Sequence, residues 1–361
     1  MGKILIYALS QNVGGIEEYT LNLIRYSENA RYKYGYIVLG DNTPYDQELL
    51  SKKIDFYYLL PKQYLIKNIK DSFFLFKHLK KEYDTIYFNT SAIGYIVPYV
   101  WAIFFRYKIV IHSHSDGTKT ANWVKKIVHS FHSKILSIFI KKRFACSENA
   151  AKWMFGRKYK NTIIVPNAID IERFRYNKEK GKELREKNHF GDAIVLGNVS
   201  RLNKIKNHSF LLKLVREFCK RNVDIRLLLV GDGEERETLE NLSKKLQIEK
   251  YVNFWGQTNR PEDIMNAMDV IVMPSFTEGF PVTLVEAQAA GLPCVVSDSI
   301  SEEVNITGNV KFLSLNQSYD EWIDIIMSIS KVRYDAKEKL INKGYDVRYF
   351  EKEIWVQIKE C

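Results

Sequence analysis

Residues 270–297, VIVMPSFTEGFPVTLVEAQAAGLPCVVS, contain one complete strand–helix–strand unit. Short, nearly continuous apolar runs stand at 270–273 and 294–297, and Pro281 precedes a helical pattern over 282–290. Proline is favoured near the first position of a helix. Apolar runs without polar alternation are typical of parallel strands that are buried on both faces. This stretch therefore predicts part of a parallel α/β sheet.

The same alternation of apolar runs and helical patterns occurs in two series, separated by a polar, charged stretch at 170–188. Each series predicts one parallel sheet covered by helices. The chain of 361 residues also exceeds one hydrophobic core, at roughly 100 to 200 residues for each domain. The predicted strands lie at 4–8, 36–39, 56–60, 85–88, 109–112, 143–146 and 163–165 in the first series, and at 194–199, 225–230, 252–254, 270–273, 294–297 and 310–313 in the second.

The composition excludes several classes of protein. With 46% hydrophobic and 27% charged residues, the chain is typical of a globular protein without low-complexity tracts. The four cysteines show no C-x-x-C spacing, so neither a disulfide framework nor a zinc site is predicted. The longest apolar run, 94–105, is shorter than the roughly 20 residues of a membrane-spanning helix. We therefore expect a cytoplasmic protein.

Positive charge is concentrated in the first half of the chain. Residues 1–175 contain 27 lysines and arginines against 14 acidic residues, and 117–147 contain seven basic residues and no acid. In 117–147 the basic residues alternate with apolar ones, which is the pattern of a basic amphipathic helix. Such a helix either packs its apolar side in the core and exposes its lysines, or lies on an anionic membrane surface. Nucleic acid is not an expected partner, because zinc-finger spacing and aromatic RNA-binding patterns are absent from the sequence.

Open parallel sheets bind ligands beyond the carboxyl ends of their strands, where helix N-termini favour anions. At this edge of the first sheet, Gly14 and Gly15 precede a helix; they either let backbone N–H groups approach a phosphate or simply form a turn. In LLVGDGEER (228–236), Gly231 follows a strand, but Arg236 occupies the third glycine position of a dinucleotide fingerprint. The sequence also lacks a P-loop, so neither NAD binding nor ATP hydrolysis is predicted.

Charged residues stand at the same edge of the second sheet. In SRLNKIKNH (200–208), Arg201 and Lys206 follow a predicted strand, and two fixed cations suit a diphosphate. Glu278 follows a later strand, and Glu286 lies one turn inside the next helix. Carboxylates accept hydrogen bonds from sugar hydroxyls. The alternatives are solvated surface lysines and carboxylates that only stabilise a helix N-terminus.

The segment EGFPVTLVEAQAAGLP (278–293) resembles the Glu-x7-Glu segment of the retaining glycosyltransferases of family four. Further segments follow in the order of that family: Gly14-Gly15, HSHS (112–115), ACSE (145–148), VPNAID (165–170), GNVSRLNKIKNH (197–208), LLVGDGEER (228–236), VNFWGQ (252–257) and VVSDS (295–299). The likeness covers nearly the whole chain. HSHSD and ACSENAAKWMFG further resemble bacterial members that build capsular or exopolysaccharide repeat units.

The resemblance implies the GT-B fold, an α/β architecture of two Rossmann-like domains whose parallel sheets face each other across a cleft. Residues 1–168 would form the N-terminal, acceptor-binding domain. Residues 169–344 would form the C-terminal domain that binds a nucleotide-sugar donor, and residues 345–361 a C-terminal helix that crosses back to the first domain.

The resemblance also implies roles for single residues. Those that would line the donor and nucleotide site are Gly14, Gly15, Arg201, Lys206, Gly231, Gln257, Glu278, Gly279, Phe280, Thr283, Leu284 and Glu286. The two cations would neutralise the diphosphate. The backbone N–H groups that would help them are those near Gly14, Gly15, Thr283 and Leu284. Glu286 would hold the ribose and Glu278 the donor sugar, while Gly231 and Gln257 would border the base.

The catalytic residues implied in this way are His112, His114, Arg201, Lys206 and Glu278. The family has a single histidine beside the reacting anomeric carbon, and either His112 or His114 aligns with it, so that choice stays open. A metal site at these histidines and Asp116 lacks a fourth ligand. Since no Asp-x-Asp pair occurs either, neither a metal nor another cofactor is predicted.

We therefore predict a metal-independent, retaining hexosyltransferase that uses a nucleotide sugar, most naturally a UDP-sugar, in the biosynthesis of bacterial cell-surface polysaccharide such as capsule or exopolysaccharide. Its acceptor would be an undecaprenyl-diphosphate-linked sugar or a glycan. Such an acceptor places the protein at the anionic inner face of the cell membrane, as a peripheral membrane protein. The alternatives are a nucleotide-sugar epimerase of GT-B fold and a non-catalytic protein that binds membrane or polysaccharide.

Overall fold

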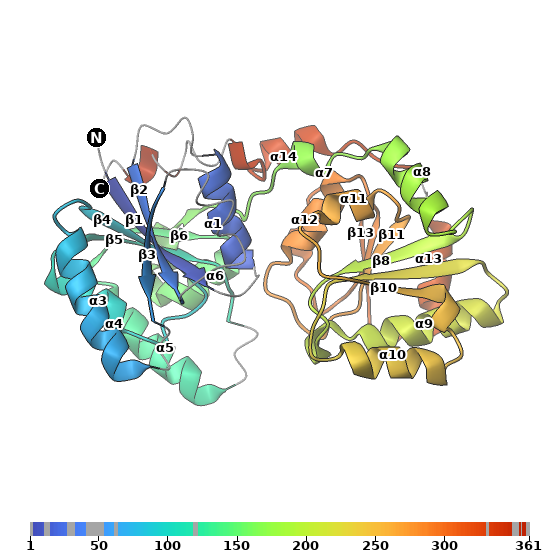
Figure 1. Ribbon diagram of the computed structural model, residues 1–361, viewed down its shortest axis with the longest axis horizontal. Helices are drawn as coiled ribbons and strands as arrows, with labels where there is room; N and C mark the ends of the chain where they lie inside the picture. Colours follow the sequence, from blue (N-terminus) through green and yellow to red (C-terminus); the bar gives the residue numbers. More distant parts are fainter. Residues whose placement is uncertain are drawn as a thin grey trace. The chain divides into compact units, whose positions relative to one another are not determined.

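The computed structural model describes residues 3–10, 15–26, 33–40, 54–60, 64–117, 122–329, 332–348, 354 and 356–358. The contacts within the chain divide it into two compact units. The first consists of Met1–Ile169 together with Asp346–Cys361, and the second of Asp170–Tyr345. Each unit contains its own parallel sheet with helices packed against it (Figure 1).

The sheet of the first unit has its described strands in the order β3-β2-β1-β4-β5-β6-β7, and they pair in parallel. The strands are β1 (Lys3–Ser10), β2 (Lys33–Leu39), β3 (Asp55–Leu59), β4 (Thr85–Thr90), β5 (Lys108–Ser113), β6 (Ile140–Ala145) and β7 (Ile163–Ile164). The helices are α1 (Gly15–Tyr26), α3 (Leu65–Leu79), α4 (Val97–Phe104), α5 (Trp123–Leu136), α6 (Glu148–Phe155) and the 3₁₀ segment η2 (Gly156–Asn161). The order reverses between β1 and β4, where sheets of this kind bind ligands.

Connections between parallel strands are right-handed, and this rule places the helices. The connections through α3, α4 and α5 all lead in the same direction along the sheet, from β3 to β4, from β4 to β5 and from β5 to β6. These three helices therefore lie on one face of the sheet (Figure 1). The strands between the helix layers are buried, which explains why their sequences are nearly continuous apolar runs.

The closing residues of the chain pack in the first unit. Asp346 forms an isolated bridge with Ile169, and the Val347 N–H donates to the Ile169 carbonyl oxygen (3.0 Å). Val347 and Ile358 are buried in the same core as the first strands. Of the helix predicted over 345–361, the structure describes residues 345–348, 354 and 356–358.

The sheet of the second unit has its described strands in the order β10-β9-β8-β11-β12-β13, again in parallel. The strands are β8 (Ile194–Val199), β9 (Ile225–Val230), β10 (Val252–Gly256), β11 (Val270–Met273), β12 (Cys294–Ser297) and β13 (Val310–Leu313). The helices are α7 (Ile171–Phe174), α8 (Lys178–Lys187), α9 (His208–Lys220), α10 (Arg236–Lys245), α11 (Pro261–Met265), α12 (Val282–Ala289), α13 (Tyr319–Ser328) and α14 (Lys337–Asn342), with 3₁₀ segments η3 (Lys204–Lys206), η4 (Glu249–Tyr251) and η5 (Glu302–Val304). The order reverses between β8 and β11, so the loops that follow these two strands are neighbours.

The strand–helix–strand unit predicted from 270–297 is confirmed as β11, α12 and β12. Helix α12 ends one residue earlier than predicted, because Ala290 is its C-cap and Gly291 follows with a φ of +66°. A Cβ atom at Gly291 would also lie 2.5 Å from the Tyr334 carbonyl oxygen. Glycine is therefore required at this turn.

Arg333 joins several helix ends of the second unit. Its guanidinium donates to the carbonyl oxygens of Ala290 (2.8 Å), Met265 (3.0 Å) and Met268 (2.5 Å). It also lies over the Tyr176 ring, 4.3 Å from the ring centre. Carbonyls at helix C-termini have no partner within the helix, and Arg333 supplies one for α11 and α12. Burial lowers the pKa of Arg333 to about 10, so its charge persists at neutral pH.

Replacing Arg333 by methionine keeps apolar volume but removes these donors. Each buried carbonyl left without a partner costs about 1–3 kcal/mol. We expect the free energy of unfolding to fall by about 3 kcal/mol and the Tm by roughly 6–12 °C, measured by calorimetry. Arg221→Met is the control, because Arg221 binds Asp320 and Asp324 at the surface. Equal Tm changes in the two variants would contradict the proposed role.

Candidate active site

Hydrogen bonds connect the loop after β8 to the loop after β11. The side chain of Asn207, whose backbone is left-handed with a φ of 55°, donates to the Pro274 carbonyl oxygen (3.1 Å). The Phe276 N–H donates to the Ile205 carbonyl oxygen (2.9 Å). These two contacts bring the short 3₁₀ segment that carries Lys206 next to the residues that precede α12.

Lys206 and Glu278 form a buried ion pair across these two loops. The Lys206 Nζ lies 2.6 Å from the Glu278 Oε1, and the side chains are 16% and 2% exposed. Placing two charges away from water costs several kcal/mol for each ion, and the cost is offset only when the geometry is good. The pair thus holds one cation and one carboxylate at a fixed position beyond the carboxyl ends of two adjacent parallel strands, where anionic ligands bind.

Helix α12 begins directly after this carboxylate. Its N-cap is Pro281, and the Leu284 N–H already donates to the Pro281 carbonyl oxygen (3.0 Å). Thr283 lies one residue closer to the helix N-terminus and is half-buried. Glu286 is half-buried one turn inside the helix. Of the two amides predicted to face a phosphate, the one of Leu284 is therefore engaged within the helix turn.

Arg201 lies in a different environment from Lys206. Its Nη2 is 3.1 Å from the Glu234 Oε2 in the loop after β9, and the two side chains are 66% and 57% exposed. Ion pairs at this degree of exposure contribute little to stability. The structure thus brings Lys206 and Glu278 together but places Arg201 against Glu234. Sequence reasoning missed this partner, although Glu234 stands in the LLVGDGEER segment at the same sheet edge.

Gly231 has a packing role in the same region. Its φ is +132°, and a Cβ atom there would lie 2.1 Å from the Ser200 carbonyl oxygen. The Gly231 N–H donates to the Gly256 carbonyl oxygen (2.8 Å). The absence of a side chain at Gly231 therefore lets the loops after β8, β9 and β10 approach closely. Gln257, which directly follows Gly256 in the sequence, is exposed.

The predicted turn Gly279-Phe280 is half-buried. The Phe280 ring stacks on the Tyr345 ring, with 5.9 Å between centroids and 13° between planes. This contact holds the residues that follow Glu278 against the end of the second unit.

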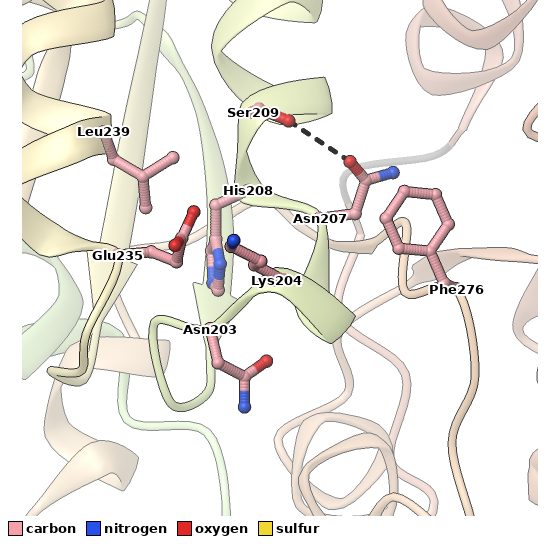
Figure 2. A pocket seen from close by; sticks show the side chains of 8 residues that line it. All are labelled: Asn203, Lys204, Asn207, His208, Ser209, Glu235, Leu239 and Phe276. Atoms are coloured by element: carbon pink, nitrogen blue, oxygen red, sulfur yellow. Dashed lines mark hydrogen bonds between the residues drawn. The ribbon is translucent and has the colours of Figure 1, made fainter. Parts of the chain in front are cut away.

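A cavity of about 270 Å³ lies beside the loop that carries Lys206. Figure 2 shows the side chains that line it: Asn203, Lys204, Asn207, His208, Ser209, Glu235, Leu239 and Phe276. His208 is buried, and its Nε2 lies 3.1 Å from the Asn198 Oδ1. Burial, and then the charge of Lys206, lower the pKa of His208 to about 4. Lys206 and Glu278 are not among the lining residues, so this cavity is not the site of the ion pair.

In the first unit, His112 and His114 lie close together at the end of β5, with 4.1 Å between ring centroids. The His112 Nδ1 lies 2.6 Å from the Tyr87 hydroxyl and 3.1 Å from the Tyr19 hydroxyl. His112 is fully buried, and 8% of His114 is exposed. Burial, and then the neighbouring His114, lower the pKa of His112 well below its usual range. Both rings are therefore neutral at pH 7.

His114 is held between two asparagines. Its Nδ1 lies 2.8 Å from the Asn167 Oδ1 and its Nε2 lies 3.0 Å from the Asn89 Oδ1. A neutral imidazole has a single N–H, so only one of these two amide oxygens can accept from the ring. The Asn89 Nδ2 is directed to the Thr20 hydroxyl (3.5 Å), which leaves its oxygen for an Nε2–H.

Of the two glycines predicted to approach a phosphate, Gly14 lies outside the described residues. Gly15 is the exposed first residue of α1, and a Cβ atom added there would meet no described atom within 4 Å. Packing inside the first unit therefore does not explain the glycine at this position.

Among the described residues, no group of three or more His, Cys, Asp or Glu side chains is arranged to hold a metal ion. Over the same part of the chain, the helices are too short or too polar to cross a bilayer. The reaction without a metal stays a prediction.

Two family models match the chain, Glycosyltransferase Family 4 over residues 13–173 and Glycosyl transferases group 1 over residues 179–347. The putative glycosyltransferase EpsF of Bacillus subtilis (strain 168) is 30% identical over 369 residues, which cover 96% of this chain and 94% of EpsF. The chain belongs to the family 4 glycosyltransferases. The predicted family and the α/β fold of two Rossmann-like units are confirmed.

Further relatives of this glycosyltransferase include the UDP-Gal:alpha-D-GlcNAc-diphosphoundecaprenol alpha-1,3-galactosyltransferase of Escherichia coli. That enzyme is 31% identical over 257 residues, which cover 68% of this chain and 64% of the enzyme. The crystal structure of Anabaena HepE in complex with UDP-glucose superposes with a TM-score of 0.82 at 21% identity. The superposition covers 99% of this chain and 100% of HepE, and it shows a common fold.

The stability of the ion pair can be tested with a double-mutant cycle. Glu278→Gln removes the carboxylate that accepts from the Lys206 Nζ, and we expect a loss of about 3 kcal/mol in the free energy of unfolding. Lys206→Met combined with Glu278→Gln removes both charges and should restore more than half of that loss. Urea unfolding measures both values. Additive losses in the double variant would show that the two side chains are not coupled.

The acid sensitivity of the first unit provides a second test. Burial lowers the pKa of His114 to about 4, from an ordinary value of 6.5. Between these two values the unfolded chain binds a proton that the folded chain does not, so stability falls as the pH is lowered, by about 1.4 kcal/mol per pH unit. The free energy of unfolding should therefore depend less steeply on pH in His114→Gln than in the wild type, between about pH 6.5 and pH 5. Parallel curves for the two proteins would refute the assignment.

Proposed function

We propose that this glycosyltransferase moves a hexose-type sugar from a UDP-sugar to a lipid-linked or glycan acceptor, with retention of the anomeric configuration. The product would enter a bacterial cell-surface polysaccharide. The single observation that carries the proposal is the buried pair of Lys206 and Glu278 at the ligand-binding edge of the second sheet. The reaction needs a cation for a phosphate beside a carboxylate for a sugar, and this pair supplies both.

The charge of Lys206 would act on the leaving group. When the bond between the anomeric carbon and the diphosphate breaks, negative charge increases on the phosphate oxygens, and a cation already in position stabilises it. An ammonium group has three donors, so Lys206 would donate to a phosphate oxygen as well as to Glu278. Glu278 would use its further lone pairs to accept from hydroxyl groups of the sugar.

Arg201 would join Lys206 by exchanging its partner. Its ion pair with Glu234 is exposed and therefore weak, while a bidentate contact with a phosphate is charge-assisted and stronger. Binding of the diphosphate would thus draw the guanidinium away from Glu234. Together the two side chains would supply the positive charge for a metal-independent reaction. Glu286, one turn inside α12, would accept from the ribose.

The bond changes balance without a covalent intermediate. The acceptor hydroxyl oxygen bonds to the anomeric carbon on the face that the diphosphate leaves, and its proton passes to a phosphate oxygen of that leaving group. Of the two histidines, we assign the place beside the reacting carbon to His114, because His112 is fully buried and both tyrosine hydroxyls occupy its Nδ1. Both nitrogens of the neutral His114 ring lie against asparagine side chains, so the ring would pack beside the reacting sugar without adding charge.

The comparisons support the choice of substrates. The Escherichia coli relative is named for a UDP-sugar donor and an acceptor on diphosphoundecaprenol, and HepE binds UDP-glucose in its crystal structure. An undecaprenyl-linked acceptor lies in the cytoplasmic membrane. The protein would therefore act in the cytoplasm, at the inner face of that membrane.

Lys206→Ala should lower kcat/KM for sugar transfer by about 10² to 10³, as does the loss of one preorganised donor to a developing negative charge. Arg201→Ala should lower it by a similar factor. Lys204→Ala is the matched control, since Lys204 is an exposed lysine in the same loop, and it should retain wild-type activity. Transfer from a radiolabelled UDP-sugar to a diphosphate-linked acceptor measures the rates.

The binding of UDP to the same variants provides a second measurement. A ligand at 100 times its Kd stabilises the folded state by about 2.7 kcal/mol, which a thermal-shift assay detects. We expect UDP to raise the Tm of the wild type and of Lys204→Ala, and to raise the Tm of Lys206→Ala less. If Lys206→Ala and Lys204→Ala behaved alike in both assays, the assignment of the site would fail. Conversion of the donor to its epimer without any acceptor would indicate an epimerase instead.

A further inference from the structure

Helix α5 buries two polar side chains and leaves several of its large apolar side chains exposed. Its buried residues are His129, Ser133 and Leu136. Trp123, Ile127 and Phe131, one helical turn apart, are 70%, 58% and 61% exposed. Residues four positions apart lie on one face of a helix, so these side chains form a continuous apolar stripe on the outer surface.

Hydrogen bonds fix this orientation. The Ile93 N–H donates to the His129 Nδ1 (3.0 Å), and the His129 Nε2 lies 3.1 Å from the Trp153 carbonyl oxygen. The Ser133 hydroxyl donates to the Met154 carbonyl oxygen. Buried polar groups are costly unless they are paired, and these are paired. Rotating α5 to bury its apolar stripe would break each of these bonds.

Helix α3 also buries two polar side chains, in addition to the apolar Phe76 and Leu79. It buries Asn68, which accepts from the Tyr95 hydroxyl (2.8 Å), and Ser72, which accepts from the Trp101 Nε1 (3.1 Å). Ile66 and Phe74 on the same helix are 85% and 57% exposed. Two helices on one side of the sheet thus bury polar side chains while large apolar side chains on the same helices stay exposed.

Helix α4 completes the surface between them. Phe104 is 64% exposed and contacts Phe73 of α3, with 6.2 Å between ring centroids. Right-handed connections place α3, α4 and α5 on one face of the sheet (Figure 1). We call the outward side chains Ile66, Phe74, Phe104, Trp123, Ile127 and Phe131 the apolar face. Large exposed apolar patches mark interaction sites.

Charge indicates what covers the apolar face. Helix α5 and the residues up to the end of β6 contain no acidic residue, while Lys125, Lys126 and Lys134 are exposed on α5 itself. A second copy of the chain would bring like charges together. Anionic lipid headgroups suit this surface, because lysines bind the headgroups while aromatic and aliphatic side chains enter the boundary with the acyl chains.

We propose that the apolar face inserts into the surface of an anionic membrane, with α5 lying in the plane of the bilayer. The inference rests on the proposed function to the extent that a lipid-linked acceptor gives this contact its purpose. It differs from adsorption by charge alone, because the apolar stripe and not only the lysines would enter the lipid. Salt should therefore weaken binding without abolishing it.

The test uses the full-length protein and vesicles of phosphatidylethanolamine with phosphatidylglycerol in a flotation assay. Ile127→Gln combined with Phe131→Gln should weaken the partition into vesicles by about tenfold or more, because two large apolar side chains leave the lipid. Lys125→Gln, Lys126→Gln and Lys134→Gln should weaken it by about fivefold for each lysine, at low salt only. Phe104→Gln on α4 provides an independent variant.

Matched controls separate this effect from a general loss of apolar surface. Met327→Gln combined with Val332→Gln removes exposed apolar side chains from the second unit and should leave flotation unchanged. Brominated lipids should quench the fluorescence of Trp123, measured as the difference between the wild type and Trp123→Phe. Equal flotation of the Ile127→Gln/Phe131→Gln variant and the wild type would overturn the proposal. Complete release of the wild type by salt would also overturn it.

Failure of this inference and failure of the proposed function give different results. If the surface is wrong but the function is right, UDP still raises the Tm and sugar is still transferred, while flotation does not respond to the apolar variants. If the apolar variants change the sedimentation of the protein without lipid and leave flotation intact, the face joins copies of the chain and the lipid proposal is rejected. In a detergent-dispersed assay with a short-chain acceptor, Ile127→Gln/Phe131→Gln should keep wild-type activity.

Discussion

The ion pair between Lys206 and Glu278 depends on the strand order of the second sheet. Because β8 and β11 are neighbours at the point where the order reverses, the loops after them meet. Two contacts, from Asn207 to Pro274 and from Phe276 to Ile205, then fix the distance between the loops. A buried pair compensates for desolvation only with good geometry. The fold therefore holds the two loops at the fixed distance that the ion pair needs. The pair in turn provides the cation and the carboxylate of the proposed reaction.

Much of the fold could be predicted because its signals are local. Most strands are short apolar runs, since helices cover both faces of a parallel sheet. The start of α12 is marked by Pro281 and its end by Gly291, and both residues act through their own backbone conformation. Such signals do not depend on the partner that an element meets in the folded protein. They were therefore sufficient to predict two α/β units from the sequence.

The candidate site was less predictable, because its geometry depends on contacts between distant residues. Lys206 and Glu278 were expected in one site and are in contact, but the pairing of Arg201 with Glu234 depends on the packing of neighbouring loops. The glycine at 231 suggested a ligand contact. Its neighbour in the structure is the Ser200 carbonyl oxygen, which no sequence pattern identifies. Residue types indicate chemistry, and tertiary packing decides which groups remain available for it.

Helix α5 shows a different limit of sequence reasoning. Periodicity reveals that a helix has an apolar and a polar face, but it does not say which of them meets the core. In this unit the core side offers carbonyl and N–H groups of Ile93, Trp153 and Met154, and these pair with polar side chains of the helix. The apolar stripe is then exposed to water, which is unfavourable in free energy. Its counterpart must be an apolar phase outside the unit, and the surrounding lysines favour one that carries negative charge.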